Sequence, residues 1–517
     1  MKETRRDFIK KTGGCALGMV SLATQMHLLG GITAMAQKAI DSQPDVITDY
    51  KALVLLYWQG GCDGNNMIIP NHHDANVSNW DTYSALRVPQ ASGGLAFDQT
   101  QLANTSITVP NIAGLTYAMH PNFDTPGGFN KGIYDLYGQG KLAIVANVGN
   151  LVRPLTKAQY QSASFKKPYQ LFSHSDQVTQ SQSSNAATQA FTGWGGRLAD
   201  SVDPLYNYSG GQPSRLVPMV TSIAGAQLFT SGQLTLPMAI SQANNTGVSN
   251  LTTVLNPAGF GTSPTGSTLS RLNTFNALRQ QDLNQNYVAA ASHVTDLAIA
   301  ANNALKNSQD VTVPFPNTSV GLQLKQVARM IKSRNELNVS RQVFYVQVGS
   351  FDTHTAQIAG QGSLVTQVSQ AMRAFWDELG PTAQNVQDLV TTFTLSDFSR
   401  TMNPAGVGGS TGSDHAWGNH MLVMGGAVAG GNIYGSRRPD ASGTGDIMPT
   451  LVLGGTDDVD TGTGARGRWL PTTSVDQYCA VLARWFGLPQ DAATLASVFP
   501  NLANFSTGTF PTLNFLP

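Results

Sequence analysis

The residues best suited to chemistry in this sequence are aspartates and histidines that stand close together in polar, glycine-rich segments. The clearest group is Asp414-His415, with His420 five residues further along the chain. Carboxylate oxygens and imidazole nitrogens are ligands that Zn²⁺ accepts together, and Asn419 offers an orienting partner for a neutral imidazole. This segment predicts a metal site, with a polar loop that carries incidental histidines as the alternative.

A second pair, Asp352 and His354, follows a short apolar run. The two residues are two positions apart, so a carboxylate oxygen and an imidazole nitrogen can both reach one cation. Phe351 lies beside them and would shield such a site. In the alternative interpretation Asp352 caps the helix that follows, a common role for aspartate, and His354 is a surface residue.

Two further aspartates also stand just beyond apolar runs. Asp63, in the segment 59–66, would present a hard oxygen ligand, although Asp-Gly and Gly-Gly pairs also form ordinary turns. Asp397 is another candidate ligand. Arg400 beside it is a candidate oxyanion clamp, because a guanidinium fork matches phosphate or sulfate. A plain surface ion pair between Asp397 and Arg400 is the alternative.

The segment 172–176 contains the candidate catalytic serine. Ser173 or Ser175 is a possible nucleophile, with His174 or a metal ion as its activator. Serine and aspartate also make local turns, so a purely structural role is the alternative. We take Ser173, His174 and Arg400 as the predicted catalytic residues.

Strands and helices that alternate along the chain must position these segments. Short apolar runs bounded by turn signals predict buried strands, and apolar residues at helical spacing predict helices between them. The expected strands are Ala52–Trp58, Leu142–Ala146, Leu216–Ser222, Val343–Val348, Val390–Leu395, Met421–Met424 and Met448–Leu453, and the expected helices are Phe129–Gly138, Leu269–Leu305, Val320–Leu337, Leu364–Leu379 and Tyr478–Phe486. This alternation indicates an α/β fold, in which ligands bind beyond the carboxyl ends of the strands.

The composition favours an exported protein with a weakly charged surface. Charged residues make up 12% of the chain, about half the usual ~25%, and Gly, Ser, Thr, Asn and Gln take their place. Beyond residue 36 the chain has 26 basic and 29 acidic residues, a net charge of −3, which gives no electrostatic reason to expect nucleic-acid or anionic-membrane binding. Cys62 and Cys479 could form one disulfide, and neither belongs to a zinc-finger pattern.

The N-terminus predicts export. Arg5-Arg6 precedes a mildly apolar stretch, about Gly13 to Met35, that ends in a small-x-small cleavage site. This resembles the twin-arginine (Tat) signal, with the Tat translocase as the partner and the periplasm or the exterior as the destination. The stretch is diluted by Gly, Ser and Gln, so we expect no stable membrane anchor. We therefore assign residues 1–36 to the signal and residues 37–517 to a single α/β domain, with polar insertions around 156–267.

At these segments the chain resembles a family of Tat-exported bacterial proteins of unknown function that is related to the alkaline phosphatase and sulfatase superfamily. The matching pieces are Arg5-Arg6, Gly60-Gly61-Cys62-Asp63-Gly64, His120-Pro121, Phe172-Ser173-His174, Gly349-Ser350-Phe351-Asp352-Thr353-His354, Ser396-Asp397-Phe398-Ser399-Arg400 and Ser413-Asp414-His415. The resemblance implies an alkaline-phosphatase-like fold, with a central mixed, mostly parallel sheet and helices on both faces. It also implies a site for one or two metal ions, with ligands among Asp63, Asp352, His354, Asp414, His415 and His420, to which the residue pattern itself adds Asp397.

Taken together, these observations predict an exported metal-dependent hydrolase of phosphate or sulfate esters, with a small anionic ester as substrate. Zinc is the first choice of cofactor, and manganese, calcium and magnesium are alternatives. A metal would polarise the ester oxygen and activate Ser173 or a water molecule. The rival hypothesis is an exported binding or assembly protein on the same fold, with a structural or degenerate metal site; a carbohydrate-binding surface protein is a third.

Overall fold

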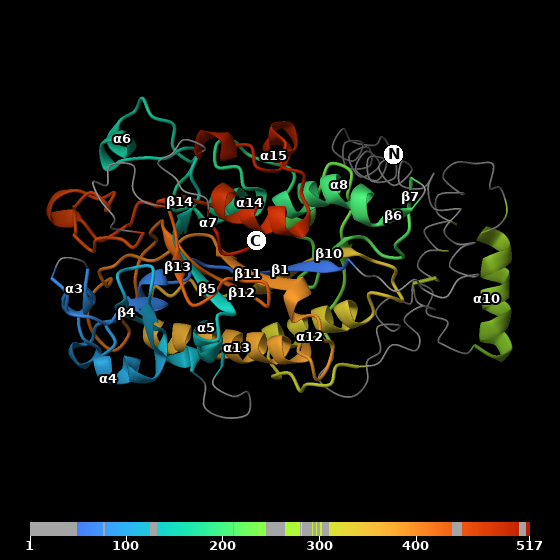
Figure 1. The fold of residues 1–517 in the computed structure, drawn as a ribbon, viewed down its shortest axis with the longest axis horizontal. Helices are drawn as coiled ribbons and strands as arrows, with labels where there is room; N and C mark the ends of the chain where they lie inside the picture. Colours follow the sequence, from blue (N-terminus) through green and yellow to red (C-terminus); the bar gives the residue numbers. More distant parts are fainter. Residues whose placement is uncertain are drawn as a thin grey trace, which may run out of the picture.

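The computed structural model describes residues 49–517 apart from 76–77, 125–131, 210, 244–263, 280, 282–291, 293–295, 297–299, 302–309, 437–446 and 506–512. At its centre is a nine-stranded sheet with helices packed against both faces (Figure 1). The α/β class expected from the sequence is thereby confirmed. The predicted export signal, residues 1–36, lies outside the described residues.

The central sheet is mixed. Its strand order is β13-β5-β12-β11-β1-β10-β8-β9, and β14 also pairs with β5. Strand β12 runs antiparallel to both of its neighbours, whereas β1 runs parallel to β10 and β11. The sequence analysis predicted a mostly parallel sheet. The structure instead has a reversed strand, β12, inside the sheet and not at an edge. The strands are β1 (Lys51–Trp58), β5 (Leu142–Gly149), β8 (Val220–Ser222), β9 (Met238–Ala239), β10 (Arg341–Val348), β11 (Val390–Ser396), β12 (Asn419–Gly425), β13 (Ile433–Tyr434) and β14 (Thr473–Ser474).

The central strands are apolar along almost their whole length because both faces of the sheet are covered. All residues of β1 from Ala52 to Trp58 are buried. In the parallel registers Trp58 lies opposite Val348 of β10 and Ser396 of β11. The carboxyl ends of the three strands are therefore level, and the polar segments that follow them start at one edge of the sheet.

Successive side chains of each strand enter two separate hydrophobic cores, as strand geometry requires. Val54 and Leu56 belong to one core, which contains apolar residues of α5, α12 and α13. Leu53 and Leu55 belong to the other, which contains apolar residues of α7, α8, α14 and α15. Figure 1 shows these two helical layers on opposite sides of the sheet. The helices of the layers are α5 (Tyr134–Gly138), α12 (Ser319–Lys332), α13 (Gln357–Glu378), α7 (His174–Ser183), α8 (Trp194–Tyr206), α14 (Val475–Phe486) and α15 (Ala492–Val498).

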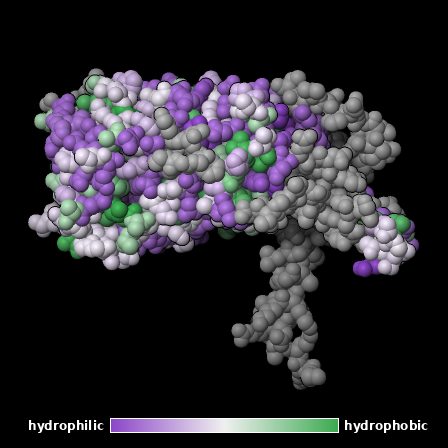
Figure 2. All heavy atoms as spheres, turned by 90° about the horizontal axis from the view of Figure 1, so that it is seen from below, coloured by the Kyte–Doolittle hydropathy of each residue, from purple (hydrophilic) through white to green (hydrophobic). Residues whose placement is uncertain are grey.

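The remaining described elements lie around this framework. A three-stranded sheet has the order β2-β4-β3, and β6 pairs with β7. The view in Figure 2 shows a surface of mainly hydrophilic and neutral residues, with apolar residues in small separate patches. The elements are β2 (Ile68–Pro70), β3 (Ser106–Val109), β4 (Leu115–Met119), β6 (Tyr208–Ser209), β7 (Gln212–Pro213), α3 (Trp80–Arg87), α4 (Gln99–Leu102), α6 (Lys157–Gln161), α10 (Gly266–Arg279), and the short 3₁₀ helices η1 (Gly64–Asn66), η2 (Gln90–Ser92), η3 (Ala103–Thr105), η4 (Pro121–Phe123), η5 (Leu228–Thr230), η6 (Gln387–Leu389), η7 (Gly462–Gly464) and η8 (Leu502–Phe505).

Six of the seven expected strands are present, and the seventh prediction was wrong. The run Met448–Leu453 contains no strand. Pro449 removes a backbone donor, and Leu451 has a positive φ of 54°, so this run does not pair as an extended strand. Within the described part of the polar segment 156–267, β8 extends the central sheet and α8 packs against it.

Of the three cysteines in the sequence, Cys62 and Cys479 lie in the described part of the chain, and both are buried and free. Cys62 lies in the core that contains α12 and α13, and Cys479 in the core on the other face of the sheet. A disulfide between them, which the sequence left open, is absent because the sheet lies between the two thiols. Within the described residues, no helix combines the length and the apolar character that a membrane span requires.

Candidate metal centre

Five segments of the sequence meet at the level edge of the sheet. The loops after β1, β10 and β11 start there together, as the parallel registers require. A bridge between Arg400 and His415 joins the segment before β12 to the loop after β11. The fifth segment is the start of α7, whose first residue is His174. Candidate residues separated by more than 200 positions thus become neighbours.

Three side chains at this edge form a group that could hold a metal ion. They are His174, Asp352 and His415, whose ligand atoms all lie within 4.8 Å of one another. The Nε2 atoms of His174 and His415 are 3.1 Å apart. Oδ1 of Asp352 lies 3.5 Å from the first nitrogen and 3.4 Å from the second. In a tetrahedral zinc site with bonds of about 2.0–2.1 Å, neighbouring ligand atoms are about 3.3 Å apart, so these separations suit such an ion.

A third imidazole adjoins the group. Nε2 of His354 lies 3.0 Å from Nε2 of His415 and 3.1 Å from Oδ1 of Asp352. The side chains of His354 and Asp352 are 44% and 45% exposed, and that of His174 is 33% exposed, so the group is open to solvent on one side. A fourth ligand or a substrate therefore has access to it.

The other nitrogen of each ring faces an acceptor. Nδ1 of His174 is 2.8 Å from Oδ2 of Asp397, and Nδ1 of His415 is 2.9 Å from the carbonyl oxygen of Phe172. Nδ1 of His354 is 3.4 Å from Oδ1 of Asp414. A carbonyl or carboxylate oxygen only accepts, so in neutral rings Nδ1 carries the proton and Nε2 carries the lone pair.

This arrangement brings lone pairs of several rings to one point. When His174 and His415 are neutral, their Nε2 lone pairs face each other at 3.1 Å, beside the Asp352 carboxylate. Only a cation or a shared proton makes such a contact favourable. Histidine ligands in metal sites usually donate their second N–H to a carboxylate or a backbone carbonyl, which is the pattern found here.

The electrostatics of the group differ between its members. The hydrogen bond to Asp397 raises the pKa of His174, whereas burial lowers the pKa of His415. Partial burial of Asp352 acts to raise its pKa, but the hydrogen bond and charge of Arg400 outweigh it, and the pKa of Asp352 falls below its usual value. Asp352 is therefore a carboxylate at neutral pH, and His415 is a neutral ring with a free lone pair.

The backbone around the group is strained in ways that position its side chains. Phe172, whose carbonyl orients His415, has a φ of 69°, and Ser350, just before Asp352, has a φ of 72°. Gly60 has a φ of 112°, and a Cβ there would lie 2.6 Å from the backbone nitrogen of Asp352. A Cβ on Gly61 would lie 2.5 Å from the ring of Phe398. Only glycine permits this close approach of the loops, and such strain is common at functional sites.

Asp63 does not join the group. Its side chain is fully buried and forms an ion pair with Arg87, which is also fully buried. The amide of Gln357 donates to the same oxygen, and the backbone N–H of Asn65 donates to the other. The sequence assigned Asp63 as a metal ligand, but its oxygens are already taken by protein donors. It holds the loop after β1 in place instead.

Arg400 is buried and connects several loops, and it does not present free donors to an anion. Its Nε donates to the carbonyl of Gly61, and Nη2 donates to that of Gly60. Nη1 donates to the carbonyl of Ser413, and Nη2 also reaches the carboxylate of Asp352. The side chain is fully buried. Its donors are committed to fixing three loops, so it has none left over for a substrate.

Asp397 and Asp414 contact imidazole rings on the side away from the possible ligand atoms. Asp397 is buried; it accepts from the backbone N–H of Gly60 and holds His174. Asp414 forms an ion pair with Arg466 and faces His354. Both were candidate ligands from the sequence, and in the structure both orient imidazoles.

Ser173 is not aligned with a general base. Its hydroxyl donates to Oδ2 of Asp176 at 2.5 Å and lies 3.2 Å from the hydroxyl of Ser175. It precedes the first residue of α7, where serine often caps a helix. The ring of its neighbour His174 is engaged with Asp397 and His415 instead.

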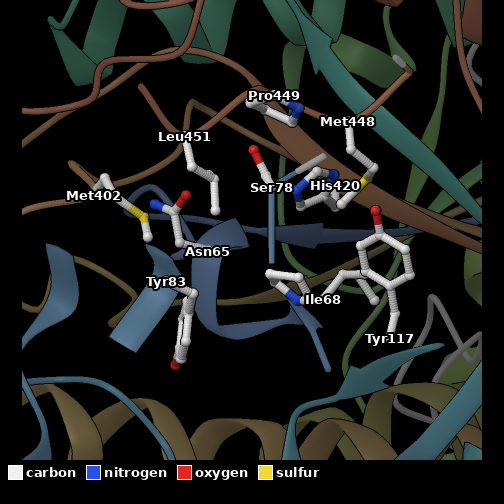
Figure 3. Close-up of a pocket in the computed structure, with 11 residues that line it drawn as sticks. Asn65, Ile68, Ser78, Tyr83, Tyr117, Met402, His420, Met448, Pro449 and Leu451 are labelled. Atoms are coloured by element: carbon white, nitrogen blue, oxygen red, sulfur yellow. The ribbon is translucent and has the colours of Figure 1, made fainter. Parts of the chain in front are cut away.

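His420 is separate from the group. It is buried, and its Nδ1 accepts from the backbone N–H of Asn147 at 3.3 Å. Burial lowers the pKa of His420 to about 4, so the ring is neutral. It lines a cavity of about 20 Å³ together with Asn65, Ser78 and Tyr83 (Figure 3). A cavity of this size holds about one water molecule and is too small for a substrate.

Comparison with known families gives one match. The family described as "Protein of unknown function (DUF1501)" matches residues 50–476, a range that includes the five segments that meet at this site. The chain belongs to this family. No curated protein matches the chain. The family match assigns no chemistry to the chain, so the function is argued from the site.

Sequence reasoning missed three contributors. They are the Phe172 carbonyl, and Arg466 and Arg468 in the segment beside Asp414-His415. A backbone carbonyl leaves no signal in a sequence. The two arginines form the pattern Arg-Gly-Arg at 466–468, in a glycine- and threonine-rich stretch that could have marked them as candidates.

Proposed function

We propose that this member of the DUF1501 family is an exported hydrolase that uses a divalent metal ion, zinc in the first place, to cleave phosphate or sulfate esters. The observation that carries the proposal is the convergence of the Nε2 atoms of His174 and His415 with the Asp352 carboxylate, while the Nδ1 atoms are held by acceptors. His354 is the candidate for a further ligand. When bound there, such an ion supplies Lewis-acid polarisation of an ester oxygen and activation of water.

The balance of charge supports an anionic substrate. Around the group, Asp352, Asp414 and Asp460 form ion pairs with Arg400, Arg466 and Arg468. These three pairs cancel, and Asp397, which contacts His174, leaves this set with one negative charge. A divalent cation would change the charge of the set to +1. An ester that carries a phosphate or sulfate group would then be attracted to the loaded site.

The roles of the chain's own residues follow from their contacts. His174, His415 and Asp352 would hold the ion, and Asp397 and the Phe172 carbonyl would fix the rings so that Nε2 faces it. Arg400 keeps the loops after β1 and β10 at the spacing that this requires. The contacts of Ser173 favour a water molecule over this hydroxyl as the attacking group. An alkaline-phosphatase-like architecture and export by the Tat pathway remain part of the proposal.

One observation favours a second candidate function. Ser173 has no imidazole partner, and the other predicted catalytic group, Arg400, has no donor to spare. A protein that binds a metal ion for structure, or to assemble with a partner, would need neither. An exported binding protein on the same fold is therefore the alternative.

The test is the metal content of the exported mature protein, measured by mass spectrometry beside a His174→Ala, His415→Ala variant. We expect about one divalent ion per chain in the wild type, with loss of the ion in the variant. His73→Ala is the matched control, because His73 is an exposed histidine bonded to Asp81 far from the group in sequence. Turnover is then measured on phosphate monoesters, phosphate diesters and sulfate esters. A metal-loaded protein that cleaves none of these would overturn the hydrolase and favour the binding protein.

Export is tested separately. Replacing Arg5-Arg6 with two lysines should retain the protein in the cytoplasm, because the arginine pair is the feature that the pathway recognises. Fractionation of cells that express the two forms measures this. Equal amounts in the periplasm would contradict the export assignment without touching the metal site.

A further inference from the structure

A pair of arginines flanks the metal centre on the side of His415. Arg466 forms an ion pair with the carboxylate of Asp414, and Arg468 donates from Nε to the backbone carbonyl of His415 at 2.8 Å. Positions 466 and 468 are two apart, and each guanidinium is anchored on one of two adjacent site residues. The segment 466–468 is therefore part of the wall of the site.

Arg468 is held in a fixed position by groups on three sides. Its Nη1 contacts the carboxylate of Asp460 at 2.9 and 3.1 Å. Its guanidinium carbon lies 5.4 Å from the ring centroid of Phe172, within the range of a cation–π contact. Phe172 is also the residue whose carbonyl orients His415. The arginine is thus preorganised before any ligand arrives.

One amino group of Arg468 has no partner. Nε and Nη1 make the contacts above, and Nη2 makes no hydrogen bond within the described residues. Nη2 is also not among the buried polar atoms that lack a partner, and the side chain is 27% exposed, so solvent reaches it. Arg400, which is fully buried, offers the opposite case: all three of its nitrogens donate to protein acceptors.

We propose that Arg468 binds the anionic group of the substrate, a tetrahedral phosphate or sulfate, beside the metal ion. The inference rests on the proposed hydrolase function and moves the role of anion clamp from Arg400 to Arg468. A guanidinium is suited to this role because it remains charged and donates in a planar fork to oxyanions. Asp460 and Phe172 fix the fork, so little side-chain freedom is lost when the anion binds.

The experiment compares metal-loaded wild type with Arg468→Gln and Arg468→Lys. The probes are inorganic phosphate and inorganic sulfate, measured by calorimetry, with metal content and melting temperature recorded for each protein. Arg334→Gln is the matched control, because Arg334 also stacks over an aromatic ring, that of Tyr50, and bonds a carbonyl in its own segment. It lies near the start of β10, away from the carboxyl edge.

We expect Arg468→Gln to weaken binding of the preferred anion by roughly ten- to a hundredfold, as for the loss of a charged hydrogen bond. Arg468→Lys should lie between it and the wild type, because it keeps the charge and loses the fork. Metal content should stay at the wild-type level in both. In turnover, KM should rise more than kcat falls. A stronger response to phosphate than to sulfate identifies a phosphate ester, and the reverse a sulfate ester.

Two outcomes overturn the inference. Equal anion affinity in wild type and Arg468→Gln, at equal metal content, would show that Arg468 does not bind the anion, and the hydrolase would stand if turnover persists. Loss of metal together with loss of anion affinity in both variants would show that Arg468 only supports His415. Absence of turnover in the metal-loaded wild type is a separate result, and it bears on the hydrolase itself.

Discussion

Two polar clusters lie at the same edge of the sheet, and they differ in whether their acceptors are satisfied. In the first, which we call the buried pair, Asp63 and Arg87 are both fully buried, and the Asp63 oxygens also receive donors from Gln357 and Asn65. In the second, the candidate metal centre, Asp352 accepts from Arg400, but the Nε2 atoms of His174 and His415 lie 3.1 Å apart and neither has a proton to donate when the rings are neutral.

The difference teaches how to separate structural from functional residues among polar groups at strand ends. Aspartates follow β1, β10 and β11 within a few residues of the strand end, yet of Asp63, Asp352 and Asp397 only Asp352 belongs to the group of possible ligands. The deciding property is the supply of protein donors. A carboxylate such as Asp63, whose oxygens all receive protein donors, has a structural role, whereas imidazole nitrogens that converge as acceptors require a cation or a shared proton.

The largest effect is expected from breaking the buried pair. Arg87→Gln should destabilise the fold by about 3–5 kcal/mol, because it leaves the Asp63 charge buried without its partner. Unfolding by denaturant measures this. At a temperature where the variant is folded, metal content should match the wild type. Loss of metal from a folded variant would contradict the separation of the two clusters.

A carboxylate that is buried without an ion pair sharpens the comparison. Asp476, in the first turn of α14, accepts from the backbone N–H of Asn501 at 3.1 Å. Burial raises its pKa to about 7, from a usual value of 3.8. Between these two values the folded state keeps a proton that the unfolded state releases, so stability attributable to this group falls as pH rises from about 4 to about 7.

Asp476→Asn should therefore raise the free energy of unfolding, relative to the wild type at the same pH, more at pH 8 than at pH 5. The increase at pH 8 should exceed that at pH 5 by roughly 2–4 kcal/mol. Thermal unfolding at the two pH values checks this. Asp491→Asn is the control, because the N–H of Thr494 lowers the pKa of this exposed helix cap and it does not titrate between pH 5 and 8. A parallel response of the two variants would argue against a special role for Asp476.

A smaller effect is expected from the groups that orient the metal ligands. Asp397→Asn should weaken metal affinity by about 10- to 100-fold, as for other partners of metal-binding histidines, since a neutral amide holds His174 less firmly. Competition with a chromophoric chelator measures the affinity. Asp388→Asn, in η6 at the far end of β11, is the control. If affinity is unchanged in Asp397→Asn, His174 is not a ligand.

The smallest effect concerns the two thiols. Because Cys62 and Cys479 lie on opposite faces of the sheet, dithiothreitol should leave the melting temperature of the mature protein unchanged. Burial also raises the pKa of both thiols, so they should react slowly while the protein is folded. Thiol titration in denaturant without reductant should then find two free groups per mature chain, and a count of zero would reveal a disulfide.

Much of the framework could be predicted from the sequence because it depends on local patterns. The apolar runs that became β1, β10, β11 and β12 are bounded by glycines and polar residues, and the structure places strands there. The same logic failed for Met448–Leu453, where Pro449 and the positive φ of Leu451 outweigh the apolar character. In the candidate site, Asp352 and His415 were marked by their spacing and loop context.

The sequence did not reveal which hydrogen-bond donor pairs with which acceptor. Nothing near Asp63 in the chain points to Arg87, and nothing near Arg400 shows that carbonyls of Gly60, Gly61 and Ser413 would use its donors. Asp397 and Asp414 are of a residue type that commonly binds metal ions. Their contacts with the Nδ1 side of the imidazoles depend on how the loops are packed.

The sequence by itself thus determined the chemical types available, the strands, and the edge at which polar groups follow them, because these depend on residue type and short-range periodicity. Only the tertiary structure decided which acceptors received a donor. That choice depends on contacts between residues tens to hundreds of positions apart, because the packing of the loops decides whether a carboxylate lies among the possible ligand atoms, as Asp352 does, or contacts the other nitrogen of an imidazole, as Asp397 does.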